Sequence, residues 1–255
     1  MSLLASNFSI LWPALLAGLI VLASHVPLGQ QVLKRGIVFI DLAIAQVAGV
    51  GVIAAHYFGL EVQGWVTQVA AVGAALLAAL LLTWTERKRP EVQEALIGVL
   101  FVLASTAQIL LLANDPHGGE DLKDLLAGQI LWVSPAQLLR AAILTALVLL
   151  VWFRARERIG RAGFYLLFAV TVTVSVQLVG VYLVFTSLII PAVATHGYPP
   201  ARQLRLGYAL TAASYLAGLL ISALTDLPSS PVIVWAMALF GLLVMVGRRP
   251  QPVAG

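Results

Sequence analysis

Long runs of apolar residues dominate the chain, and short polar stretches separate them. The runs are continuously apolar and do not alternate with polar residues, so they predict helices and not the strands of a barrel. Most are close to the roughly 20 residues that an α-helix needs to span the hydrocarbon core of a bilayer. The pattern predicts about eight transmembrane helices, at residues 8–28, 37–58, 64–84, 92–113, 135–153, 164–190, 204–224 and 231–247.

The composition indicates the same class of protein. Hydrophobic residues make up 61% of the 255 positions and charged residues only 10%, too few to cover a soluble domain of this size. No linker or low-complexity tract divides the chain, so we expect an all-α, polytopic bundle that forms one transmembrane domain over residues 1–255 in the lipid bilayer. The net charge of +4 comes from short basic loops, which suit anionic lipid headgroups and are too short to follow the backbone of a nucleic acid.

Basic residues cluster in alternate loops and so orient the predicted helices. Lys34 and Arg35 follow the first segment, and a basic group at residues 87–89 follows the third. Four arginines between positions 154 and 161 follow the fifth segment, whereas the loop at residues 115–124 is poor in Lys and Arg. The positive-inside rule places the basic loops in the cytoplasm and the N-terminus outside.

The same rule gives no consistent topology for the end of the chain. Three segments follow the basic loop at residues 154–161, and they would leave the arginine pair at 248–249 outside. Either the long run at residues 164–195, which contains Pro191, bends or re-enters the membrane, or the run after Pro231 forms two half-helices. The sequence leaves both alternatives open.

One membrane segment carries an acidic side chain. Asp41 lies well inside the apolar run at residues 37–58, and Gln46 follows it. An ionisable residue within a membrane helix is a functional hypothesis by default. The alternative is that Asp41 lies near the cytoplasmic interface and pairs with Lys34 or Arg35, and the sequence favours neither interpretation.

Motifs of soluble enzymes are missing from the sequence. It contains no Gly-x-x-x-x-Gly-Lys-Ser/Thr loop to hold nucleotide phosphates, and no cysteine for a thiolate metal site. The histidines His25, His56, His117 and His196 lie far apart and form no His-Glu-x-x-His pair. We therefore expect a transport protein that is not an enzyme and that takes its energy from a partner.

Four stretches of the sequence are informative in their order and spacing. They are Pro27 to Gly51, Ala95 to Phe101, Leu122 to Ser134, and Val179 to Ala192 with its Ile-Ile-Pro-Ala ending. Together they resemble the zinc/manganese-type permeases of ATP-binding-cassette (ABC) transporters, the ABC-3 family, over nearly the whole chain.

The resemblance implies a homodimeric permease in the bacterial plasma (inner) membrane that imports zinc or manganese. The chain itself would bind no cofactor: a separate cytoplasmic ATPase binds ATP, and an extracytoplasmic metal-binding protein delivers the ion. The loop at residues 154–163 would dock on the ATPase, through Arg156, Glu157, Arg161 and Gly163. Two alternatives remain, a permease for a metal chelate or other small solute, and a secondary transporter or channel that needs no ATPase.

The predicted metal residues are Asp41 and Gln46, and here the chain departs from the family. The family usually carries an Asp and a His four residues apart in its second helix, whereas this chain offers Asp41 with Ala45, or Leu42 with Gln46. Asp41 and Gln46 are about 140° apart around a regular helix, so only a broken helix or a dimer seam would bring them to one ion. Carboxylate and amide oxygens are harder ligands than imidazole, which predicts weaker zinc binding.

Overall fold

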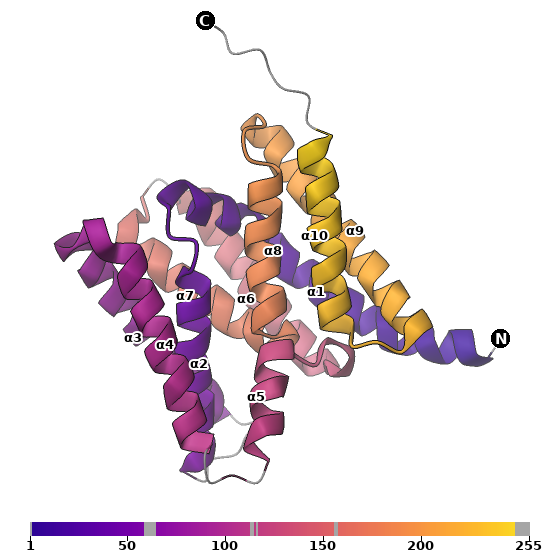
Figure 1. The fold of residues 1–255 in the computed structure, drawn as a ribbon, viewed down its shortest axis with the longest axis horizontal. Helices are drawn as coiled ribbons and strands as arrows, with labels where there is room; N and C mark the ends of the chain where they lie inside the picture. Colours follow the sequence, from indigo (N-terminus) through magenta and orange to yellow (C-terminus); the bar gives the residue numbers. More distant parts are fainter. Residues whose placement is uncertain (1, 59–64, 113–114, 116, 156–157, 248–255) are drawn as a thin grey trace, which may run out of the picture.

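The structure is a computed structural model that describes residues 2–58, 65–112, 115, 117–155 and 158–247. Every regular element within these ranges is a helix, which confirms the all-α class. Eight of the described helices are long and apolar enough to cross a membrane, as the sequence predicts. The elements of Figure 1 are α1 (Ser2–Arg35), α2 (Ile40–Tyr57), α3 (Trp65–Lys88), η1 (Pro90–Val92), α4 (Gln93–Leu112), α5 (Gly118–Ala127), η2 (Ile130–Trp132), α6 (Pro135–Ala155), α7 (Gly160–Val179), α8 (Val181–Ala194), α9 (Pro200–Thr225) and α10 (Ser229–Val246).

The long apolar run at residues 164–195 is two helices and not one. It breaks at Gly180, whose φ of +82° lies in a region that residues with a Cβ rarely adopt. Of the two alternatives that the sequence left open, the first is therefore confirmed: the run bends. The bend is not at Pro191, however, because Pro191 lies inside α8. The final run is a single helix, α10, so the division into half-helices was also wrong.

The break reverses the direction of the chain across the bundle. At the start of α8, Gly180 lies against the backbone of Gly128, in the loop that follows α5. Near the end of α8, Ala194 lines a pocket with Leu33 of α1 and Met245 of α10. Because the end of α1 is cytoplasmic by its basic residues, α8 returns to the cytoplasm, and α9 and α10 then place the end of α10 on that side as well. The topology conflict disappears.

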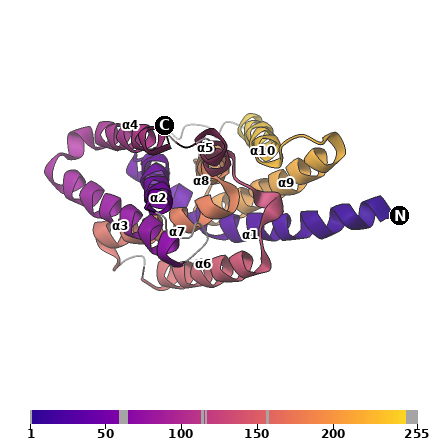
Figure 2. The same ribbon diagram turned by 90° about the horizontal axis from the view of Figure 1, so that it is seen from below.

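The cytoplasmic ends of the helices lie along the top of Figure 1, where the α3–α4 junction and the end of α10 are found. α7 is the most buried of the candidate spans, and its aromatic residues Phe164, Tyr165 and Phe168 are buried in its first turns, toward the cytoplasmic end. In contrast, α6 lies at one edge of the bundle in Figure 2 and exposes Leu139, Ile143 and Leu147. An apolar face that is exposed along a whole helix suits contact with lipid chains.

The Gly180 break has a direct test. A Cβ on Gly180 would collide with the backbone of residues 127–128, and its ψ of 164° places it in a region that only glycine adopts readily. We expect Gly180→Ala to lower the free energy of unfolding by about 1–3 kcal/mol, measured by thermal unfolding of the purified protein in detergent.

Gly98→Ala is the matched control for this substitution. Gly98 is helical and has open space around its Cα, so alanine should leave the melting temperature unchanged or raise it. Equal melting temperatures for the Gly180 variant and the wild type would contradict this account of the break.

Candidate functional site

Asp41 lies in the first turn of α2, at the cytoplasmic end of that helix. The chain leaves α1 at Arg35 and turns at Gly36, where φ is +68°, before α2 begins at Ile40. The side chain of Asp41 is 1% exposed, and neither carboxylate oxygen has a hydrogen-bond partner. The nearest backbone N–H groups, of Asp41 itself and Leu42, are close to the carboxylate without reaching hydrogen-bond geometry. Asp41 is therefore a buried acidic group without compensation by hydrogen bonds.

The basic residues at the end of α1 do not pair with Asp41. The guanidinium carbon of Arg35 lies 4.1 Å from the centre of the Phe164 ring. The other basic residue, Lys34, is exposed. Within the described part of the chain, the ion pairs are His56 with Asp115 and Arg89 with Glu91. The interfacial ion pair that the sequence offered as an alternative is thus not formed.

A second carboxylate, that of Glu94, lies beside the start of α2. The backbone N–H of Phe39 donates a hydrogen bond of 3.2 Å to Oε1 of Glu94, which joins the first turn of α4 to the residue that precedes α2. The other oxygen, Oε2, is buried and has no partner. The hydrogen bond to Phe39 places Glu94 beside the turn that leads into Asp41. The sequence analysis missed Glu94 because this residue stands at the edge of its apolar run, where an acidic residue is ordinary.

Gln46, the other predicted metal residue, is part of a different contact. The side-chain amide of Gln108, on α4, donates to the backbone oxygen of Gln46 at 2.8 Å and to its Oε1 at 2.7 Å. Gly49 leaves room for this contact, because a Cβ there would lie 2.9 Å from Nε2 of Gln108. α2 is continuous from Ile40 to Tyr57, so no break brings Asp41 and Gln46 together. Gln108 was not identified from the sequence.

The predicted docking loop lies at the cytoplasmic end of α7. Arg156 and Glu157 are outside the described residues, while Arg161 is exposed in the first turn of α7 and Gly163 follows it. The loop is tied to the rest of the bundle through Phe164, over which Arg35 is stacked.

The turn between α8 and α9 lies on the same cytoplasmic side. Arg202 places its guanidinium 4.8 Å from the centre of the Tyr198 ring, and Arg205 is exposed one turn later on α9. The sequence analysis did not include these arginines in the cytoplasmic surface, because it had not located the break at Gly180. With this topology, Arg161, Arg202 and Arg205 are exposed at two turns on the cytoplasmic side, and we call these three arginines the cytoplasmic basic surface.

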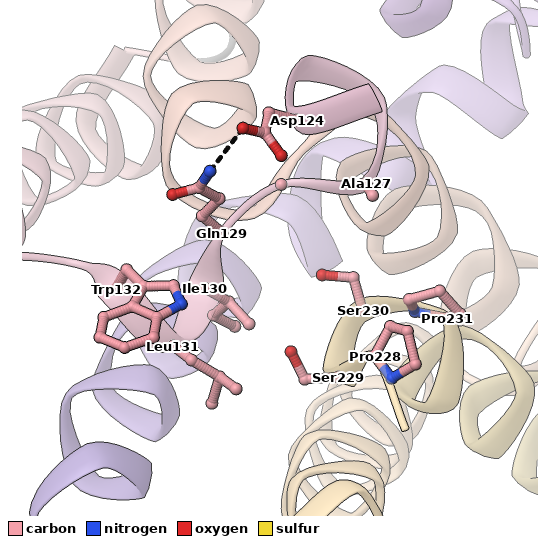
Figure 3. Close-up of a pocket in the computed structure, with 11 residues that line it drawn as sticks. Asp124, Ala127, Gln129, Ile130, Leu131, Trp132, Pro228, Ser229, Ser230 and Pro231 are labelled. Carbon is pink, nitrogen blue, oxygen red and sulfur yellow. Dashed lines mark hydrogen bonds between the residues drawn. The ribbon is translucent and has the colours of Figure 1, made fainter. Parts of the chain in front are cut away.

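An open pocket of about 500 Å³ lies on the opposite, outer side of the bundle. Figure 3 shows it between the loop after α5 and the start of α10, with Asp124, Trp132 and Ser230 on its walls. The side-chain amide of Gln129 donates a 2.6 Å hydrogen bond to Asp124 on the rim. Trp132, in the short helix η2 between α5 and α6, is 76% exposed.

The histidines contribute little to a metal site. Nε2 of His56 lies 3.9 Å from Asp115, at the outer end of α2, and both side chains are accessible to solvent. His117 lies at the start of α5, where its backbone N–H donates to Asp115 at 2.9 Å. Among the described residues, no three His, Asp or Glu side chains are grouped so that they could hold a metal ion.

Comparisons with known proteins cover the whole bundle. The profile of the ABC 3 transport family matches residues 7–161 and 155–248. The high-affinity zinc uptake system membrane protein ZnuB of Haemophilus influenzae is 24% identical over 263 residues, which are 95% of this chain and 99% of that protein. A metal transport system membrane protein of Chlamydia trachomatis serovar D is 24% identical over 285 residues, 99% of this chain and 96% of that protein. In the solved structure of PsaBC from Streptococcus pneumoniae with a Fab, one chain has the same fold, with a TM-score of 0.75, 21% identity, and 94% of this chain and 95% of that chain covered.

Proposed function

The chain belongs to the ABC 3 transport family, and on that premise we propose that it is the membrane-spanning permease subunit of an ABC importer for zinc or manganese. The observation that carries the proposal is the buried, unpaired carboxylate of Asp41 within a bundle that matches the family profile along almost its whole length. Burial of an unpaired carboxylate in a membrane helix costs free energy, so we expect the group to have a function, here contact with a transported cation. ZnuB, a relative over almost its entire length, is named for high-affinity zinc uptake.

The second candidate function keeps the architecture and changes the cargo. A permease for a metal chelate or another small solute would need no ligand set for a bare ion. The lack of a three-residue metal group in the described part of the chain favours this candidate, as does Gln46 in place of a histidine. Against it stands the pair of unpartnered carboxylate oxygens on Asp41, which a neutral solute would leave uncompensated.

We propose that the energy comes from a separate cytoplasmic ATPase that docks on the cytoplasmic basic surface, Arg161 with Arg202 and Arg205. Arg156, Glu157 and Gly163 of the neighbouring loop complete the proposed contact. Support comes from Arg161, Arg202 and Arg205, which are exposed at two turns on one side of the bundle. These turns carry more arginines than are needed to anchor helix ends at lipid headgroups. The additional positive charge suits an acidic protein partner.

On the outer side, we propose that an extracytoplasmic metal-binding protein docks over the pocket of Figure 3. An exposed tryptophan beside a polar rim is typical of the anchor residues of protein interfaces. The homodimer that the family resemblance implies is also a proposal, and native mass spectrometry of the purified permease will give the number of copies.

Uptake measurements test the function. Cells that express the permease with its ATPase are expected to accumulate radiolabelled zinc or manganese, and cells that express the permease alone are not, because the chain has no nucleotide-binding loop. Uptake of a metal chelate without uptake of either free ion would favour the second candidate function. Uphill uptake by the purified permease without nucleotide would indicate a secondary transporter.

Charge reversal tests the ATPase contact. We expect Arg161→Glu combined with Arg202→Glu to reduce co-purification of the ATPase by about tenfold or more, since both charges would repel an acidic partner. Lys123→Glu, an equally exposed reversal on the outer helix α5, is the control and should leave the complex intact. An unchanged yield of ATPase with the double variant would exclude this docking surface.

Substitution of the outer tryptophan tests the other contact. Trp132→Ala should slow uptake at low metal concentration, where delivery by the binding protein limits the rate, by roughly tenfold. Trp235→Ala is the control, because Trp235 is 71% exposed on α10 within a membrane span. Equal uptake by the two variants would remove Trp132 from the proposed interface.

A further inference from the structure

Gln93, the first residue of α4, makes hydrogen bonds to two other helices. Its side chain is buried. Oε1 accepts from the hydroxyl of Thr85 at 2.8 Å, and Nε2 donates to the backbone oxygen of Leu82 at 3.0 Å, both in the last turns of α3. Nε2 also donates to the hydroxyl of Tyr165, on α7, at 3.4 Å. One buried amide therefore joins α3, α4 and α7 at their cytoplasmic ends.

The hydrogen bonds of this amide differ in length. Its two bonds to α3 lie within the usual range of about 2.7–3.2 Å, whereas the bond to Tyr165 is longer and therefore weaker. Gln93 is thus fixed to α3, and its contact with α7 is the looser one. A displacement of the start of α7 against α3 and α4 will change the bond to Tyr165 first.

Tyr165 lies next to the proposed ATPase contact. It follows Arg161 by one turn of α7, and its side chain is buried whereas that of Arg161 is exposed. The ring of Tyr165 meets the ring of Phe164 edge-on, with 6.1 Å between the centroids, and Arg35 is stacked on Phe164. Close packing around these rings leaves little room to absorb a movement of the docking loop, so we expect the Tyr165 hydroxyl to move with the loop.

The residue after Gln93 continues the connection toward α2. Oε1 of Glu94 accepts a hydrogen bond of 3.2 Å from the backbone N–H of Phe39, which immediately precedes α2. Gln93 and Glu94 share the first turn of α4, so a displacement of one also displaces the other. Contacts that are all formed in this structure thus lead from the start of α7, through the start of α4, to the start of α2.

We propose that Gln93 is a positioning residue that transmits a movement of the ATPase docking loop to the start of α2, through Tyr165 on one side and Glu94 on the other. This inference rests on the proposed function as a permease driven by an ATPase. Contacts between two sites amount to coupling only if a change at one site alters the other, so the decisive quantity is coupling itself. Here that quantity is the amount of metal taken up per ATP hydrolysed.

The test measures ATP hydrolysis together with uptake of zinc and manganese ions by the permease–ATPase complex in vesicles. Gln93→Leu keeps most of the volume of the side chain and removes its hydrogen bonds, while Thr85 retains its 3.0 Å bond to the backbone oxygen of Leu82. Tyr165→Phe removes only the hydroxyl. For each variant we expect ATP hydrolysis to continue while uptake per ATP falls by about three- to tenfold.

Combining the two substitutions shows whether they act through one hydrogen bond. If they do, the double variant should lose no more coupling than Gln93→Leu alone. Thr173→Val is the matched control, because it also removes a buried hydroxyl from α7. The bond that it removes, of 2.8 Å to the backbone oxygen of Ala169, lies within α7, so uptake per ATP should stay unchanged.

Unchanged uptake per ATP in Gln93→Leu would overturn the proposal, and so would additive effects of the two substitutions. A parallel loss of hydrolysis and uptake with a lower melting temperature would also overturn it, because a purely structural residue gives that result. Each of these outcomes leaves the proposed function standing as long as the wild-type complex takes up zinc or manganese with ATP hydrolysis. If the wild-type complex takes up neither ion, the proposed function fails, and this inference fails with it.

Discussion

The close approach of two backbones, at Gly128 and Gly180, determines the topology of the C-terminal half of the bundle. Both residues have positive φ angles, and a Cβ on either would collide with the backbone of the other segment. Backbone groups inside a membrane must be satisfied by the helix itself or by packed protein, so a helix can break there only where another part of the chain covers the break. The loop after α5 supplies this cover. Without it, α7 and α8 would continue as one helix and the two turns that carry the cytoplasmic basic surface would lie on opposite sides.

Membrane topology thus links a packing contact to a functional surface. Because α8 returns to the cytoplasm, Arg202 and Arg205 share a side with Arg161 and with the end of α1. The outer pocket is formed by the same geometry, since the segment after Gly128 and the start of α10 are its walls. The proposed ATPase contact and the proposed contact for a binding protein therefore lie on opposite sides of the bundle.

The continuous apolar runs predicted the helices, because an apolar segment of about 20 residues can satisfy its backbone hydrogen bonds in lipid in few other ways. The ABC-3 resemblance, carried by four short stretches, is confirmed by a family profile that covers nearly the whole chain. The break at Gly180 could not be predicted, since the glycine stands in an apolar string and the reason for it is a contact with residue 128, far away in sequence. Proline at position 191 was a misleading signal: it lies inside α8, where it removes one backbone donor but does not end the helix.

The candidate site shows the same limit of sequence reasoning. Asp41 was visible because an acidic residue inside an apolar run is rare, and the search for its partner then followed the helix on which it lies. In the fold, Glu94 on another helix accepts a hydrogen bond from Phe39, two residues before Asp41, while the amide of Gln108 donates to Gln46. Pairings between helices depend on how each helix is rotated and tilted, and an apolar run carries little of that information.

The position of Asp41 in the fold relates it to the proposed ATPase contact. Gly36 separates Asp41 from Arg35, and Arg35 is stacked on Phe164, which follows Arg161 and Gly163 on α7. A motor that moves the start of α7 would therefore act on the end of α1 and, through a short turn, on the first turn of α2. These contacts connect the start of α7 with the start of α2 in space. They transmit a movement between the two helices only if the turn at Gly36 adopts two conformations. Glycine at position 36 suits that requirement, because its open surroundings and positive φ leave the turn free to change without a steric collision. Between Asp41 and the start of α7 there are thus one turn at Gly36 and one stacked arginine, so the proposed ATPase contact lies a short path from the buried carboxylate.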